Sequence, residues 1–135
     1  MERLASKSKD TFPPVPFLRE LRLRRDLEEI NSSYDFPIFQ DPEIARLFGR
    51  KGTLFGKQIQ YKLFWNETKK SIIGVVYFPY TCEGPPGSVH GGALATALDS
   101  VLGSYSFRIG GPAFVTASLN TTYKQLVPLG SVVRA

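Results

Sequence analysis

The chain has few of the residues on which several kinds of site depend. Its 135 residues include one cysteine, Cys82, and one histidine, His90. A single cysteine excludes an internal disulfide and favours a reducing compartment. Neither residue has further ligand types at the spacing that metal sites use, so we expect no bound metal.

Long apolar runs are also missing. None approaches the length of a transmembrane helix, and the opening stretch MERLASKSK lacks the apolar core of a secretory signal. The case for a mitochondrial transit peptide, which is poor in acids, is weakened by Asp10, Glu20, Asp26, Glu28 and Glu29. We expect a cytoplasmic protein, with a mitochondrial location as the alternative.

The charge is positive but scattered. The net charge is +5 and the pI is near 9.5, yet acidic residues lie among the lysines and arginines. No continuous basic stripe is available to follow a phosphate backbone, so no nucleic-acid partner is expected. The positive charge would equally suit an acidic small molecule as ligand.

The length of 135 residues and a hydrophobic content of 42% indicate one globular domain.

Helical patterns come first along the chain. Residues 17–30, FLRELRLRRDLEEI, have apolar side chains near helical spacing among charges, which predicts an amphipathic helix lying on the rest of the domain. A role at a membrane surface or a partner is the alternative. A short second helix is predicted in residues 40–48, with Asp41 as N-cap and Pro42 in the first turn.

Strand patterns follow on both sides of a longer helix. Residues 56–65 and 71–80 alternate or are rich in β-branched and aromatic residues, and the polar stretch between them predicts a hairpin. Residues 113–123 and 131–135 resume strand patterns after the helix ends at Gly110 and Gly111. A helix inserted between runs of strands indicates an α+β domain with an antiparallel sheet packed on that helix.

The helix that begins near Ser88 carries a single carboxylate, Asp99. No other formal charge lies between Glu83 and Arg108. One face has larger apolar side chains and the opposite face has small ones, so we expect the helix to be covered on most sides. The predicted packed stripe is Leu94, Leu98, Val101, Leu102 and Tyr105, and the small face is Gly91, Ala95, Thr96, Ser100 and Gly103. A carboxylate there carries a desolvation cost, which makes Asp99 a candidate general base or nucleophile. The alternative is a structural role, in which Asp99 caps another element or points to a water-filled edge.

The start of this helix is unusual as well. Ser88 is the expected N-cap, and Gly91 and Gly92 each cost about 1 kcal/mol relative to alanine. Glycines are understandable there if a ligand must approach bare N–H groups at the positive end of the helix dipole, which bind a phosphate or a developing oxyanion. Tight packing of the loop is the alternative.

Helix geometry separates His90 from Asp99. Nine positions correspond to about 13 Å along the axis and to nearly opposite faces. The two residues of one helix therefore cannot act on one atom. If both serve one site, two chains share it, as a two-fold dimer with two identical sites would allow.

Two stretches of sequence resemble a known family. HGGALATALDSVLG and GGPAFVTASLNTTYKQLVPLGSVV are similar to the hotdog-fold acyl-CoA thioesterases, in particular the phenylacetic-acid-pathway type and thioesterase superfamily members 4 and 5. The resemblance spans roughly Gly84 to Val133. It implies an N-terminal extension over 1–50 and a hotdog domain, a sheet wrapped around a central helix, over 51–135. It also implies hydrolysis of acyl-CoA to free acid and CoA in lipid metabolism, by a dimer or tetramer with shared sites.

The resemblance also implies roles for particular residues. Asp99 matches the family's general base or nucleophile, and the N–H groups of Gly91 and Gly92 match those that hold the thioester oxygen. His90 would support that turn, in an orienting role and not through direct proton transfer, and Thr116 would help to place the catalytic water or the aspartate. The alternative for His90 is a purely structural residue that caps the helix.

Substrate contacts follow from the same resemblance. Lys124 is a candidate partner for the CoA phosphates, and Asn120 is a second substrate-binding candidate. No cofactor is expected, because coenzyme A is part of the substrate. Gln125 and Leu126 stand where relatives often have Arg-Pro, a change that bears on the coenzyme A contacts.

The end of the sequence is the larger departure. A hotdog sheet continues with further strands after PLGSVV, whereas this sequence stops at Ala135. We therefore expect a sheet without its last strands. The alternative function is a non-catalytic hotdog module that binds acyl-CoA or mediates dimerisation.

Overall fold

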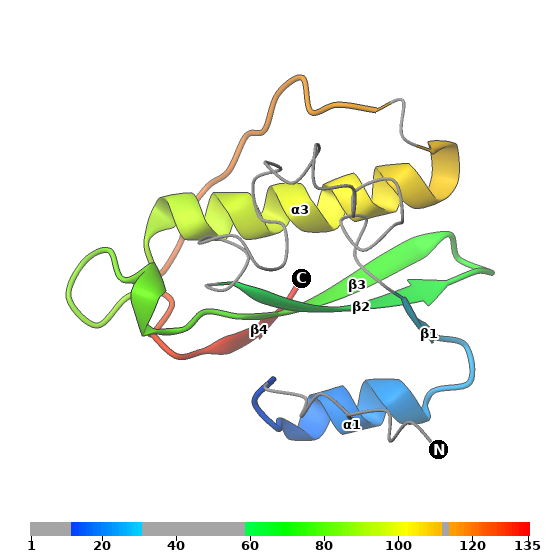
Figure 1. The fold of residues 1–135 in the computed structure, drawn as a ribbon, viewed down its shortest axis with the longest axis horizontal. Helices are drawn as coiled ribbons and strands as arrows, with labels where there is room; N and C mark the ends of the chain where they lie inside the picture. The colour runs from blue at the N-terminus through cyan, green and yellow to red at the C-terminus, as the bar shows by residue number, and fades with distance from the viewer. Residues whose placement is uncertain (1–11, 31–58, 112–113) are drawn as a thin grey trace, which may run out of the picture.

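Helices and an antiparallel sheet make up the part of the chain that the computed structural model describes, residues 12–30, 59–111 and 114–135. The elements, in chain order, are helix α1 (Pro16–Leu23), strands β1 (Glu28–Ile30), β2 (Gln60–Asn66) and β3 (Ser71–Tyr77), the 3-10 turn η4 (Tyr80–Cys82), helix α3 (Gly91–Gly110) and strand β4 (Val132–Arg134) (Figure 1). The strands pair in the order β1-β2-β3-β4, antiparallel throughout. The predicted α+β class is confirmed. The short helix predicted in residues 40–48 lies outside the described residues. Among the helices that are described, none is long and apolar enough to cross a bilayer.

The predicted hairpin is confirmed. Strands β2 and β3 pair along their full length, from Gln60 opposite Tyr77 to Asn66 opposite Ser71. The turn between them is held by Asn66, whose Oδ1 accepts a hydrogen bond from the Lys69 N–H at 2.8 Å. Lys70 closes the turn with a φ of 47°, in the left-handed region.

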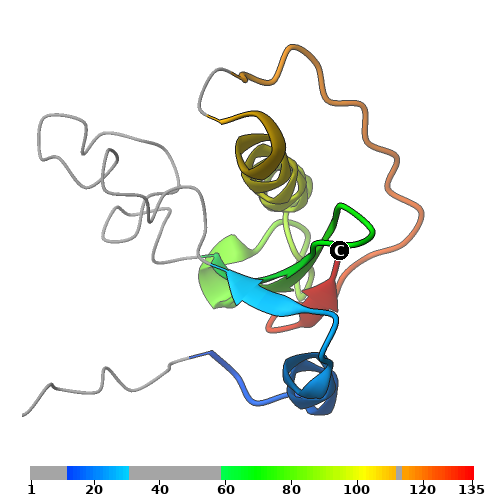
Figure 2. The same cartoon turned by 90° about the vertical axis from the view of Figure 1, so that its right-hand side faces the viewer.

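The sheet is covered on both faces. Helix α3 lies on one face and α1 on the other, which is clearest when the sheet is seen end-on (Figure 2). Neighbouring strand residues therefore enter different cores: Leu63 and Val76 pack beneath α3, whereas Phe64 and Val75 pack beneath α1. The alternation in residues 56–65 is typical of a strand with one buried face. The structure buries both faces, because α1 shields the second one.

Helix α1 is shorter than the predicted helix over 17–30. It ends at Leu23, and residues 28–30 instead pair with β2 as strand β1. The break comes at Arg24, whose backbone is extended and whose guanidinium binds the Asp26 carboxylate. Packing of this helix on the sheet is confirmed by Leu18 and Leu21, which are each 4% exposed.

Helix α3 packs through only part of the predicted stripe: Val101 is buried and Leu94 packs against the core, as expected. Its fully buried residues are small or medium in size: Ala97, Ser100, Val101 and Ser104. Leu98 and Leu102, which we expected in the packed stripe, point outward, so the expectation of a helix covered on most sides is wrong for the described chain. The close approach depends on Gly74 of β3, where an added Cβ would lie 2.7 Å from a methyl group of Val101.

Residues 114–127, which we call the strap, were predicted to contain a strand at 113–123. They are extended but pair with no described strand, so that prediction is wrong for this structure. The strap runs back over α3 (orange in Figure 1) and is anchored at its end, where the Val127 carbonyl accepts from the Val89 N–H at 2.8 Å. The strand predicted at 131–135 is confirmed as β4, paired with β3.

The contact between Gly74 and Val101 predicts a stability difference between two Gly→Ala variants. Gly74→Ala should lower the free energy of unfolding by about 1–3 kcal/mol, because the stiff valine has no room to move. Gly103→Ala is the matched control: its Cβ would meet nothing within 4 Å, and alanine should stabilise the helix by about 1 kcal/mol. Urea unfolding measures both, and equal effects would contradict the packing described.

Candidate active site

Helix α3 begins with a histidine cap. His90, not Ser88, is the N-cap: its backbone is extended, and its Nδ1 accepts a hydrogen bond from the Gly92 N–H at 2.8 Å. Because Nδ1 acts as an acceptor, the ring proton of the neutral imidazole lies on Nε2. The Ser88 carbonyl accepts instead from the Gly84 N–H, within the loop before the helix.

The two glycines that follow have different explanations. An added Cβ at Gly92 would lie 2.9 Å from His90 Nδ1, so a side chain there would displace the folded-back imidazole. A Cβ at Gly91 would lie 3.6 Å from the Tyr123 ring, which is ordinary contact, and Gly91 is not among the glycines with positive φ. The described fold therefore gives a reason for Gly92 and none for Gly91.

The N–H groups of the first turn of α3 also differ, because all but one of them have an acceptor in the described part of the chain. Gly92 donates to the His90 side chain, and Ala93 and Leu94 donate to the His90 carbonyl at 2.9 and 3.1 Å. The Gly91 N–H has no acceptor among the described residues. It is thus the open donor at the positive end of the helix dipole.

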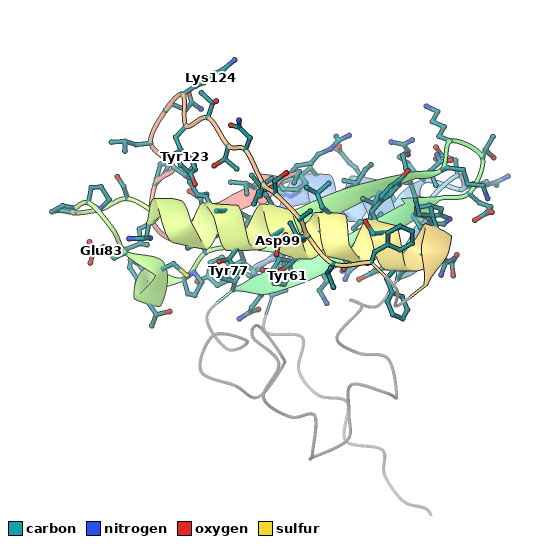
Figure 3. The ribbon with its side chains drawn as sticks, turned by 90° about the horizontal axis from the view of Figure 1, so that it is seen from above. Tyr61, Tyr77, Glu83, Asp99, Tyr123 and Lys124 are labelled. Atoms are coloured by element: carbon teal, nitrogen blue, oxygen red, sulfur yellow. The ribbon has the colours of Figure 1, made fainter. Side chains whose placement is uncertain are left out.

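Asp99 lies near the middle of α3 and is partly buried (Figure 3). The Thr116 hydroxyl, on the strap, donates to Asp99 Oδ1 at 2.7 Å. The second carboxylate oxygen has no hydrogen-bond partner among the described residues, so it is available to a water molecule or a substrate. The structure thereby brings together two residues that the resemblance had named, seventeen positions apart.

Within one chain, the other predicted site residues do not come together with Asp99 and Thr116. Gly91 and Asp99 are eight positions apart, about 12 Å along the helix. In the described part of the chain, no hydrogen bond links His90 with Asp99, or Lys124 or Asn120 with any other predicted site residue. Lys124 projects away from the helix beyond Tyr123 (Figure 3). One chain therefore presents two half-sites, one at the helix start and one at its middle.

No role was predicted for Tyr123 from the sequence. Its hydroxyl donates to the Gly91 carbonyl at 2.9 Å and so joins the strap to the helix start. It stands seven positions after Thr116, and in a regular strand an odd separation places two side chains on opposite faces. Only because the strap is not a strand do both residues reach α3.

Cys82 lies behind the helix start but offers no nucleophile. Its carbonyl accepts from the His90 N–H at 2.8 Å, and the thiol is buried. Burial raises the pKa of the Cys82 thiol, so the thiol stays protonated near neutral pH.

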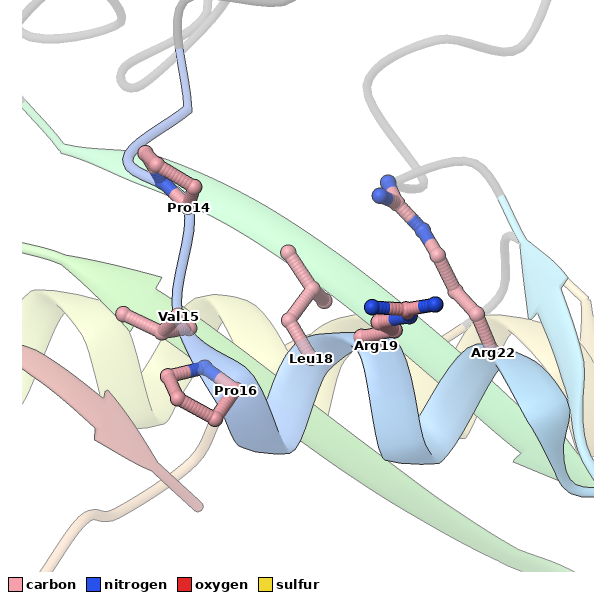
Figure 4. Close-up of a pocket in the computed structure, with 6 residues that line it drawn as sticks. All are labelled: Pro14, Val15, Pro16, Leu18, Arg19 and Arg22. Atoms are coloured by element: carbon pink, nitrogen blue, oxygen red, sulfur yellow. The ribbon is translucent and has the colours of Figure 1, made fainter.

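A cleft of about 470 Å³ opens on the other side of the sheet, beside α1 (Figure 4). Its lining combines apolar side chains with two arginines: Pro14, Val15, Pro16, Leu18, Arg19 and Arg22. Arg22 is already bound to both carboxylate oxygens of Glu29, at 2.8 and 3.0 Å. None of the predicted site residues lines this cleft, so the candidate site is on α3.

Comparison with known proteins defines the class. Residues 86–135, which contain the helix start, Asp99 and the strap, match the family model of the thioesterase superfamily. This match covers the segment that carries the candidate site, and the predicted resemblance and its hotdog-type α+β fold are confirmed.

Individual relatives carry acyl-CoA thioesterase names. The chain is 36% identical over 88 residues to acyl-coenzyme A thioesterase THEM4 of Xenopus laevis (65% of this chain, 39% of that protein). It is 32% identical over 96 residues to THEM5 of Homo sapiens (71% and 38%), and 38% identical over 119 residues to THEM4 of Bos taurus (82% and 47%). The chain spans less than half the length of these relatives.

The histidine cap predicts a measurable contribution to stability. His90→Ala should lower the free energy of unfolding by about 1 kcal/mol, because the Gly92 N–H loses its acceptor. His90→Asn should retain most of that stability, since an asparagine oxygen reaches the same N–H. Urea denaturation with amide exchange at Gly92 provides the measurement. If the two variants are equally stable, the imidazole does not cap the helix.

Proposed function

We propose that the protein hydrolyses acyl-CoA thioesters to a free acid and coenzyme A, and so serves lipid metabolism. The observation that carries the proposal is the carboxylate of Asp99, oriented by Thr116 through one oxygen and open at the other. The thioesterase names of its relatives support the same reaction.

The reaction needs a base and an oxyanion donor. The open oxygen of Asp99 takes a proton from water, and the resulting hydroxide attacks the thioester carbonyl carbon. Negative charge then develops on the carbonyl oxygen, where the Gly91 N–H and the positive end of α3 stabilise it. Collapse of this intermediate breaks the C–S bond, and the coenzyme A thiolate leaves and takes up the proton. Direct attack by the carboxylate is the alternative first step.

The two half-sites belong to different protomers in this proposal. They lie about 12 Å apart on one helix, too far to act on a single carbonyl group. A two-fold dimer brings the helix start of one protomer to Asp99 of its partner and forms two sites.

Exposed apolar surface supports such a dimer. Leu102, Ile109 and Val115 are 51%, 54% and 89% exposed, and the backbone of the strap is unpaired with any described strand. An apolar surface beside an unpaired extended segment is typical of an interface. A tetramer built from such dimers would preserve the same sites.

Coenzyme A contacts are assigned to the end of the strap. Lys124 is exposed there, and its ammonium group would bind a phosphate of coenzyme A. Asn120, also exposed on the strap, is the second substrate-binding candidate.

Replacing Asp99 separates hydrolysis from binding. Asp99→Asn should lower kcat for palmitoyl-CoA by about 10²–10⁴-fold, because the amide cannot accept the proton of water. Binding of a non-hydrolysable acyl-CoA thioether should be unchanged. Free thiol release measures turnover, and Glu20→Gln, an exposed acid on α1, is the matched control. Binding without turnover in the unaltered protein, over a panel of acyl and aryl CoA esters, would establish the non-catalytic module instead.

Replacing Gly91 tests the oxyanion donor. Gly91→Pro deletes the N–H at the first helical position, where proline is tolerated, and the extended backbone of His90 (ψ 135°) suits a following proline. Gly91→Ala adds a Cβ but retains the N–H. Relative to Gly91→Ala, Gly91→Pro should lose about 10²–10³-fold in kcat at equal stability. Equal kcat values in the two variants would assign the donor to another group.

A further inference from the structure

The peptide between Gly91 and Gly92 is held at both of its polar ends. Its carbonyl, on Gly91, accepts from the Tyr123 hydroxyl at 2.9 Å, and its N–H, on Gly92, donates to His90 Nδ1 at 2.8 Å. One partner comes from the strap and the other from the residue before the helix. The carbonyl is thus held by a side chain more than thirty positions away in the sequence.

This peptide is next to the donor that the proposed reaction uses. The Gly91 N–H belongs to the preceding peptide, and the two peptides share the Gly91 Cα. Glycine has more backbone freedom than any other residue, so without restraint the direction of the Gly91 N–H would vary. A clamp on the next peptide plane removes most of that freedom. Preorganised donors stabilise an oxyanion better than donors that must reorient during the reaction.

Tyr123 also packs against the same backbone. Its ring atoms lie 3.6 Å from the position that a Gly91 Cβ would occupy, so the ring covers one side of the glycine. The strap has two side-chain hydrogen bonds to α3, from Thr116 to Asp99 and from Tyr123 to Gly91. No backbone hydrogen bond of residues 114–126 to another described segment adds to them. The hydroxyl of Tyr123 is therefore a principal tie between the strap and the helix start.

We propose that Tyr123 is a positioning residue for the thioesterase reaction: with His90 it clamps the Gly91–Gly92 peptide and so fixes the direction of the Gly91 N–H. The inference rests on the proposed function, since it names what aims the oxyanion donor. Tyr123 itself does not touch the reacting atoms. It acts through the backbone of Gly91.

Tyr123→Phe tests this, because it removes the hydroxyl and keeps the ring on Gly91. We expect kcat to fall about tenfold with KM unchanged, the loss that corresponds to one hydrogen bond of moderate strength. Tyr80→Phe is the matched control: Tyr80 is exposed and makes no hydrogen bond among the described residues. It should leave kcat unchanged. A wild-type kcat for Tyr123→Phe would overturn the proposal.

A double variant distinguishes positioning from general stabilisation. Once Gly91→Pro has deleted the N–H, nothing is left for Tyr123 to aim, so adding Tyr123→Phe should not lower kcat further. Losses that multiply in the double variant would show that Tyr123 acts elsewhere and would overturn the proposal.

Amide exchange tests the clamp without any activity. In the full chain, Tyr123→Phe should speed exchange of the Gly92 amide, which is hydrogen-bonded to His90, severalfold relative to Tyr80→Phe, as followed by NMR. Unchanged exchange would refute the clamp even in an active enzyme. Faster exchange in a protein that hydrolyses no thioester would retain the clamp and reject the proposed function alone.

Discussion

The close contact between helix α3 and strand β3 determines the rest of the structure. Val101 fits against Gly74 only because the strand has no side chain there, and the helix then rests on the sheet through small residues. With Ala97, Ser100 and Ser104 inward, Leu98 and Leu102 face outward. The outward leucines and the partly open carboxylate of Asp99 are both consequences of this one packing choice.

The same constraint explains why the site is divided. A helix that lies flat on the sheet holds its amide-bearing start and its mid-helix acid at a fixed separation, and no side-chain rotation brings them together. The strap accompanies the helix along this length and contacts both half-sites, at Thr116 and at Tyr123. The two half-sites, the helix start with the Gly91 N–H and the Asp99 carboxylate at mid-helix, therefore lie at two points along the axis of α3.

Much of this was predictable from the sequence, and the failures have identifiable physical causes. The β2–β3 hairpin follows from alternation and a polar turn, and Gly111 ends α3 as a glycine in the left-handed region, so local rules were enough there. The pairing of Asp99 with Thr116 was within reach only through the family resemblance. Helix periodicity placed Val101 correctly in the packed face of α3 but wrongly added Leu98 and Leu102, because the side chains that meet the sheet depend on Gly74, seventeen positions before the helix begins.

Two other failures concern competition between local and distant partners. Residues 24–30 have a helical pattern, yet the open edge of β2 pairs with residues 28–30 and turns them into a strand. Residues 113–123 have a strand pattern, but a strand needs a neighbour, and no described segment pairs with them. The roles of Gly91 and Gly92 look identical in sequence. The two roles can be told apart only when the position of the His90 ring is known, because that ring lies next to the position that a Gly92 Cβ would occupy.

The central claim is that one protomer supplies the Gly91 amide and its partner supplies Asp99. The most direct test is a heterodimer of the Asp99→Asn and Gly91→Pro chains, co-expressed with different tags and isolated by both. Each homodimer has two defective sites, whereas the heterodimer has one site with both groups intact. The account predicts about half of the wild-type turnover per dimer from the heterodimer. A heterodimer as inactive as its two parents would contradict it.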